Sequence, residues 1–220
     1  MQEEKAGYER NTVTKRVSRV TILVNAGLAV FKVVSALLGH SGAMLADAVH
    51  SFSDVLGSVA VLIGACVADL PRNKGKSYLQ DRIEGGISLV LSLLLFYLAA
   101  EIGMGGIREI LSGQYKTEEI PTLLPLAAAI LSILAKELLY RFSIAAANRI
   151  DSVALRALAW HNRADAFITA GSLIGISGAR WGFPIFEPLA TVLISAFILR
   201  AASEILMEAA AALRRSSKGR

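Results

Sequence analysis

The chain has 220 residues, of which 54% are hydrophobic and 19% charged, and its mean hydropathy is +0.53. Soluble domains carry about a quarter charged residues, so this composition favours a multi-pass integral membrane protein. The net charge of +5 is explained by basic cytoplasmic loops and predicts no nucleic-acid partner. The single cysteine, Cys66, excludes an intramolecular disulfide and a cysteine-based metal cluster.

Six stretches of the sequence are long and apolar enough for transmembrane helices, which need about 20 residues each. They are predicted at about 18–39, 43–67, 83–107, 121–146, 154–178 and 183–207. We therefore expect an all-α membrane protein with six transmembrane helices over residues 18–207. A cytoplasmic tail is predicted at 1–17, and a short basic cytoplasmic tail at 208–220.

The distribution of lysine and arginine predicts how the six helices are oriented. Fifteen of these residues fall in the N-terminal tail up to Arg19, the segments 68–82 and 141–153, and the C-terminal tail. The three connections predicted on the other side of the membrane contain only Arg108, Lys116 and Arg180. Because basic residues accumulate on the cytoplasmic side, both termini are predicted to be cytoplasmic. In a prokaryote this would be the inner membrane.

Ionisable residues gather on one face of each of two predicted spans. The second span contains Asp47, His50 and Asp54, whose spacing places them on one helical face. The fifth span contains His161 and Asp165, again four positions apart. A shift of 111 residues superposes His50 on His161 and Asp54 on Asp165. The sequence therefore contains a short local repeat of one functional helix.

Two histidines and two carboxylates on separate helices are suited to a tetrahedral metal site. Zinc accepts nitrogen and oxygen ligands in this geometry, whereas calcium, magnesium and manganese favour oxygen alone. The alternative is that each histidine only forms a hydrogen bond with the aspartate on its own helix. Two matching pairs inside a membrane, where unpaired charge is costly, favour the metal site. Without a thiolate, such a site would bind its metal reversibly.

The segments SGAMLADAVHSFSDV (41–55) and WHNRADA (160–166) resemble the signature helices of the cation diffusion facilitator family. This resemblance implies a six-span transporter, not an enzyme, that exports divalent cations in exchange for protons as a homodimer. It also implies that the transported ion binds to His50, Asp54, His161 and Asp165. In this family the two-histidine, two-aspartate set is associated mainly with zinc, and also with cadmium and cobalt, while all-aspartate sets are linked to manganese. Zinc is then a transported substrate, and no cofactor is expected.

The sequence departs from the family pattern in three respects. Most members carry a C-terminal cytoplasmic domain, which we expect this chain to lack, and many have a histidine-rich loop between spans four and five. The first cytoplasmic loop has Gln80 where a histidine is usual, so an accessory metal site there is not expected. We predict either a minimal family member that dimerises through its membrane helices, mainly span three, or a truncated form of a longer protein. The candidate interface residues are Gly85, Gly86, Gly103, Gly105 and Gly106, with the alanine-rich end of span six at 201–212.

Other polar residues within the spans are candidates for supporting roles. Asp47 is expected either to orient a ligand histidine or carry a proton, or else to lie exposed to water at the extracellular mouth. Asn25 and Glu137 are weaker candidates for contacts around the metal or for proton coupling. We expect Lys136 to extend toward the membrane surface and Glu137 to pair inside the bundle, with Lys32 as its candidate partner.

Two other functions are compatible with parts of the sequence. A membrane scaffold or sensor would bind zinc without moving it. An intramembrane serine protease would use the GHSG segment at 39–42, with Ser41 as nucleophile and His161 as base. The protease alternative leaves both partner aspartates unexplained, and it requires Ser41 and His161 to lie at the same depth. His40, in the same short turn, is expected to be a solvated loop residue.

Overall fold

The computed structural model describes residues 2–68, 77–117 and 119–218, and this part of the chain is almost entirely helical, without a strand. Six long helices follow one another along the chain, with one short 3-10 turn, η2, between the third and fourth. They are α1 (Gln2–Gly39), α2 (Gly42–Ala68), α3 (Ser77–Ser112), η2 (Gln114–Lys116), α4 (Leu123–Arg149), α5 (Val153–Arg180) and α6 (Phe186–Lys218). The predicted all-α fold is confirmed.

Two of the helices extend well beyond the spans predicted from hydropathy. Helix α1 begins at Gln2 and α6 ends at Lys218, so helix occupies most of the predicted tails. The segment before residue 18 contains no proline and is rich in glutamate, lysine, arginine and alanine, which favour helix in water. Hydropathy locates the apolar part of a helix and does not locate its ends.

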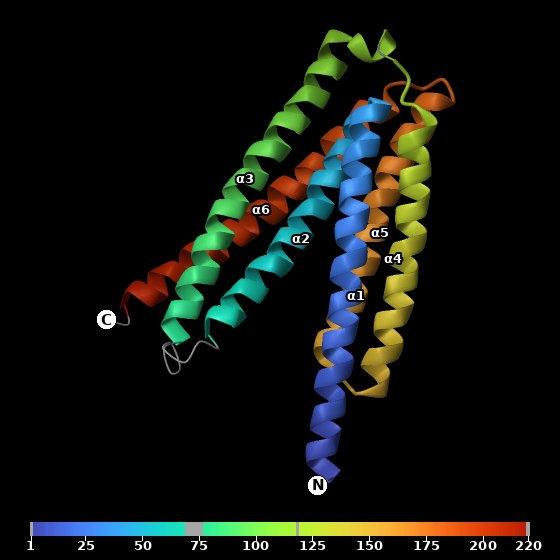
Figure 1. Cartoon of the computed structure of the whole chain (residues 1–220). Helices are drawn as coiled ribbons and strands as arrows, with labels where there is room; N and C mark the ends of the chain where they lie inside the picture. The colour runs from blue at the N-terminus through green and yellow to red at the C-terminus, as the bar shows by residue number, and fades with distance from the viewer. Residues whose placement is uncertain (1, 69–76, 118, 219–220) are drawn as a thin grey trace.

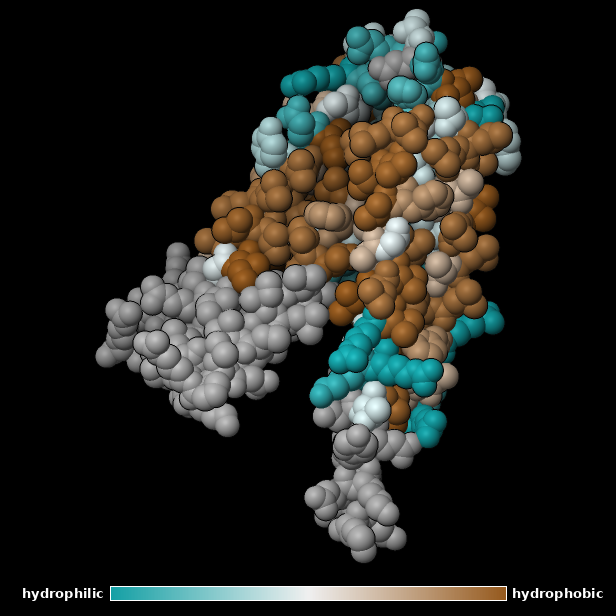
Figure 2. Space-filling model, in the orientation of Figure 1, coloured by the Kyte–Doolittle hydropathy of each residue, from teal (hydrophilic) through white to brown (hydrophobic). Residues whose placement is uncertain are grey.

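Within the described residues, four helical segments are long and apolar enough to cross a membrane: Thr12–Gly39, Gly86–Ser112, Leu123–Arg149 and Phe186–Ala211. Helix α5 is not among these segments. It contains Arg156, Arg163 and Asp165, whose charge lowers its hydropathy. Figure 2 shows an apolar band across the visible face, bounded by hydrophilic residues near two ends of the molecule.

The helices run alternately up and down, so that the two chain ends and the α4–α5 connection lie at the same end (Figure 1). The most extensive contacts join α3 to α6 and α4 to α5, while α2 contacts α1, α3, α5 and α6. Helices α3 and α6 diverge from α1 and α4 toward the end that carries the termini (Figure 1). Helix α2 therefore connects the two halves of the bundle and lies against α5.

Side-chain caps and close approaches fix the positions of the helices. The Thr122 hydroxyl accepts a hydrogen bond from an amide in the first turn of α4, and that of Ser152 does the same for α5. Gly39 at the end of α1 lies so close to α4 that a Cβ atom would be 2.2 Å from Pro125. Gly175 on α5 would bring a Cβ atom within 2.4 Å of Ala190 on α6. Larger residues at these two glycines would force the helices apart.

Two glycines predicted to line a dimer interface are used within the chain. Cβ atoms on Gly103 and Gly106 would each come within 3.0 Å of α6 side chains, Ser195 and Val192 respectively. These glycines therefore allow α3 to pack closely on α6, as small residues do between membrane helices. Cβ atoms on Gly86 and Gly105 would meet no atom of the described residues within 4 Å. The surroundings of Cys66, Gln80 and Gly85 lie outside the described part of the chain.

Candidate metal centre

Helices α2 and α5 bring three of the four predicted ligands together. His50, Asp54 and Asp165 each offer one ligand atom, and these atoms all lie within 4.8 Å of one another. The His50 Nε2 atom is 3.8 Å from Asp54 Oδ2 and 3.6 Å from Asp165 Oδ1. Ligand atoms that share one zinc ion at about 2.0–2.2 Å are themselves about 3.5 Å apart. The three atoms are therefore spaced for a single small cation.

The burial of these side chains makes an ion between them favourable. The side chains of His50 and Asp54 are 13% and 16% exposed, and that of Asp165 is 3% exposed. The Nε2 atom of His50 is buried and has no hydrogen-bond partner among the described residues. A buried polar atom without a partner costs about 1–3 kcal/mol. Coordination of a cation by this nitrogen would remove that cost.

The fourth predicted ligand, His161, lies at the edge of this group. Its Nε2 atom is 3.8 Å from Asp165 Oδ2, and its side chain is 49% exposed. The spacing of four residues on α5 places the histidine and the aspartate on one face, as predicted. His161 does not belong to the cluster of three, because its ligand atom does not lie within 4.8 Å of the ligand atoms of all three other residues.

A buried lysine that the sequence did not point out as part of the site contacts Asp165. The Nζ atom of Lys136 on α4 lies 2.5 Å from Asp165 Oδ2, and the lysine is 1% exposed. The expectation that Lys136 extends to the membrane surface is wrong. Its acidic partner makes the interior favourable for the ammonium group. The available signal was a lysine in the middle of a long apolar span.

Glu137 occupies the position that had been expected for Lys136. Its Oε1 atom accepts a hydrogen bond from Arg141 Nε at 3.0 Å, and its Oε2 atom lies 3.9 Å from Arg163 Nε. The predicted pairing of Glu137 with Lys32 is wrong. Successive residues on a helix point about 100° apart, so only one of Lys136 and Glu137 can face the interior of the bundle.

Asp47 takes part in a second buried ion pair, one turn from His50. Its Oδ2 atom lies 2.9 Å from the Nζ atom of Lys32 on α1, and both side chains are fully buried. The same ammonium donates hydrogen bonds to Ser51 on α2 and to Thr169 on α5, at 3.0 and 2.8 Å. The alternative of a water-exposed Asp47 is therefore wrong. This ion pair joins α1 to both ligand-bearing helices.

Asn25 makes a different contact between α1 and α5. Its side-chain amide donates a hydrogen bond of 3.5 Å to the Asn162 carbonyl oxygen, and both residues are buried. Asn162 directly follows His161, so this contact can influence the candidate ligand only through the helix backbone.

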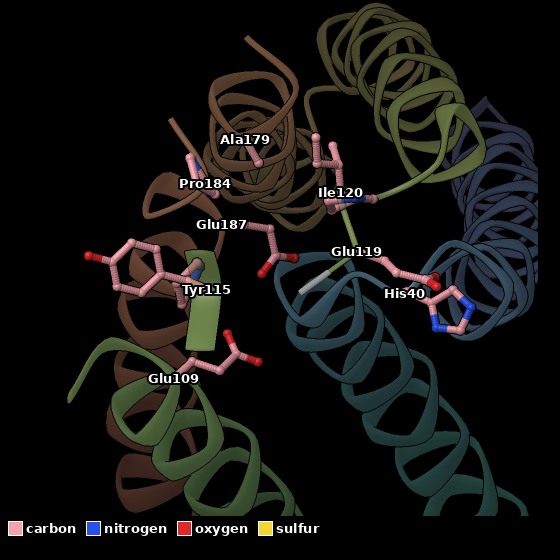
Figure 3. A pocket seen from close by; sticks show the side chains of 10 residues that line it. His40, Glu109, Tyr115, Glu119, Ile120, Ala179, Pro184 and Glu187 are labelled. Atoms are coloured by element: carbon pink, nitrogen blue, oxygen red, sulfur yellow. The ribbon is translucent and has the colours of Figure 1, made fainter. Parts of the chain in front are cut away.

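Figure 3 shows a pocket whose wall contains none of the four candidate ligands. It lies where three connections between helices meet, and three glutamates contribute to its wall. The polar residues that line it are His40, Glu109, Tyr115, Glu119 and Glu187. His40 is exposed, as predicted for a solvated loop residue. The pocket is not the metal centre.

Ser41, the candidate protease nucleophile, has a structural role in the same region. Its hydroxyl donates a hydrogen bond to Glu187 Oε1 at 2.8 Å and accepts one from the Met44 amide at 3.1 Å. The hydroxyl therefore caps the start of α2 and joins it to α6. The histidine expected as its base, His161, contacts Asp165 instead.

Comparison with known proteins gives a family for the chain. Residues 18–213 match the cation efflux transmembrane domain. The chain is 33% identical over 186 residues to the uncharacterized transporter YdbO of Bacillus subtilis, a match that covers 84% of this chain and 63% of YdbO. It is 29% identical to the magnetosome protein MamB of Paramagnetospirillum magneticum, covering 81% of this chain and 60% of MamB.

A third relative is named for the metal it exports. The chain is 25% identical to the manganese efflux system protein MneP of Bacillus subtilis, over 90% of this chain and 68% of MneP. The chain thus spans about three fifths to two thirds of the length of these three relatives. Since the family domain covers most of the helical bundle, including both helices of the candidate metal centre, the chain belongs to the cation efflux family.

Proposed function

We propose that this protein exports a divalent metal cation across a membrane by binding it between α2 and α5. The observation that carries the proposal is the cluster of His50, Asp54 and Asp165, whose ligand atoms lie within 4.8 Å of one another. Helices with the length and composition of membrane spans surround this cluster. A cluster of ionisable side chains at this depth is costly unless it has a function.

Zinc is the proposed substrate, with cadmium and cobalt as further candidates. His50 supplies an imidazole nitrogen, and a second imidazole, that of His161, lies 3.8 Å from Asp165. Imidazole favours zinc and cobalt, whereas manganese prefers oxygen ligands. MneP is named for manganese efflux, so manganese is the competing substrate that an experiment must include.

We propose that protons drive export by competing for the ligands. Histidine coordinates a metal only when it is neutral, so protonation on the outer side would release the ion. The site would face alternate sides of the membrane in turn. In Figure 1, α3 and α6 diverge from α1 and α4 toward the end that carries the termini. That end would be cytoplasmic under the positive-inside rule.

In the proposed organisation, residues 18–207 form the transport domain, with cytoplasmic segments at 1–17 and 208–220. A homodimer through the membrane helices remains our proposal, and α3 offers an outward face for it. Val90, Leu93 and Tyr97 are 65%, 52% and 63% exposed, whereas Ser92 and Leu95 are buried. Cysteines introduced at the three exposed positions, with Cys66 replaced, should crosslink in native membranes, and those at the two buried positions should not. Equal or absent crosslinking at all five would contradict this interface.

A zinc-binding scaffold that moves no metal is the alternative that an experiment must separate. Purified protein in sealed proteoliposomes, with a zinc-sensitive dye inside, should transport zinc faster when a proton gradient is imposed. Asp54→Ala should abolish this flux, and Asp151→Ala, on an exposed connection, should not. Zinc binding without flux in the intact protein would support the scaffold. Flux that is equal in Asp54→Ala would refute the proposed site.

A further inference from the structure

We propose that the ammonium group of Lys136 occupies the place of the metal on Asp165 in the empty site, and that it leaves this carboxylate when the metal binds. The inference rests on the proposed function. It makes Lys136 a positioning residue that sets the affinity of the site for its substrate.

The two oxygens of Asp165 face different partners. Oδ1 lies 3.6 Å from His50 Nε2, on the side of the cluster contributed by α2. Oδ2 lies 2.5 Å from Lys136 Nζ and 3.8 Å from His161 Nε2. The ammonium therefore holds the carboxylate oxygen that would join His161 to a shared ion.

This arrangement explains why the described cluster contains three ligands and not four. His161 is half exposed and approaches only the oxygen that Lys136 already contacts. A charged ammonium on this oxygen repels a cation that binds to the same carboxylate. A divalent ion that used this oxygen to bind all four residues would therefore compete with Lys136 for it.

The burial of Lys136 strengthens the argument. The residue is 1% exposed, and an unpaired charge at this depth is costly. The ion pair with Asp165 stabilises the protein without metal. Because metal binding would break this pair, the energy needed to break it opposes binding. Such opposition is useful in a carrier, because a site that binds its substrate too tightly releases it slowly.

Zinc titration by calorimetry in detergent tests the inference without a transport assay. Lys136→Gln should raise zinc affinity at least tenfold. Lys32→Gln is the matched control, because it removes a buried lysine that is paired with Asp47 and not with a ligand. It should change the affinity less than threefold. An unchanged or lower affinity in Lys136→Gln, in a protein with wild-type helical content, would overturn the inference.

A double-mutant cycle separates direct competition from a general effect of charge. His161→Ala should reduce zinc affinity more in the Lys136→Gln background than in the wild type, because Asp165 Oδ2 would then be free to join His161 to the ion. Equal losses in both backgrounds would overturn the inference.

The wild-type protein provides a test that does not depend on the folding of a variant. In a structure with zinc bound, the distance from Lys136 Nζ to Asp165 Oδ2 should exceed 4 Å. An unbroken contact beside a bound ion would overturn the inference and leave the proposed function intact. A wild-type protein that binds no zinc, cadmium, cobalt or manganese would overturn both.

Discussion

The ion pair between Lys32 and Asp47 is expected to contribute strongly to the stability of the bundle. Both side chains are fully buried, and the ammonium is 2.9 Å from one carboxylate oxygen and 3.0 Å from the other. Replacing Asp47 with asparagine keeps the shape and removes the compensating charge. Breaking a buried ion pair by removing one partner costs about 3–5 kcal/mol. Because the amide oxygen still accepts a hydrogen bond, we expect Asp47→Asn to lower the free energy of unfolding by about 3 kcal/mol.

Unfolding in mixed micelles with increasing amounts of denaturing detergent, followed by circular dichroism, measures this change. The double variant Lys32→Met with Asp47→Asn should be more stable than Asp47→Asn alone, because no unpaired ammonium remains. The matched control is Asp151→Asn, which breaks an exposed pair of 3.5 Å with Arg156. Exposed pairs contribute about 0–1 kcal/mol. A loss below about 1 kcal/mol for Asp47→Asn, or strictly additive effects in the double variant, would refute the reasoning.

Three further predictions concern the site and the packing of α5. Asp165→Ala combined with Lys136→Met, which leaves no unpaired ammonium, should abolish metal flux in proteoliposomes while the protein stays folded, and wild-type flux would exclude this carboxylate as a ligand. His50→Asp should shift selectivity from zinc toward manganese in a competition assay, since it exchanges nitrogen for oxygen; an unchanged ratio would place selectivity elsewhere. Gly175→Ala should destabilise the protein by about 1–3 kcal/mol, because its Cβ would lie 2.4 Å from Ala190. Gly171→Ala, where a Cβ meets no described atom within 4 Å, should not destabilise it.

The sequence was sufficient to predict the number and order of the helices. Apolar runs of about 20 residues are required to cross a bilayer, so their count follows from hydropathy once charged residues inside α5 are tolerated. The ends of α1 and α6 could not be found in this way, because charged helix formers continue a helix into water. The close approaches at Gly103 and Gly106 were also ambiguous. A glycine pattern shows that a helix can pack closely, and it does not show whether the partner is α6 or a second protomer.

The candidate ligands were predicted because each histidine–aspartate pair lies on one helical face. Periodicity within one helix cannot show how that helix is rotated against its neighbours. For this reason, the opposite placements of Lys136 and Glu137 could not be obtained from the sequence of α4 alone. The inward face of α4 is decided by Asp165, which lies on α5. The same limitation applies to Asp47, whose partner Lys32 lies on α1.

The two buried lysines determine how much charge the centre carries with and without a metal. With neutral histidines, Asp47, Asp54 and Asp165 contribute three negative charges, and Lys32 and Lys136 contribute two positive ones. The empty centre then has a net charge of one unit negative, and a divalent ion makes it one unit positive. Without the lysines, the empty centre would carry three negative charges in an environment where each is costly. In the proposed site, the two lysines would therefore keep the empty and loaded states equally close to neutrality, as suits a site that both binds and releases its ion.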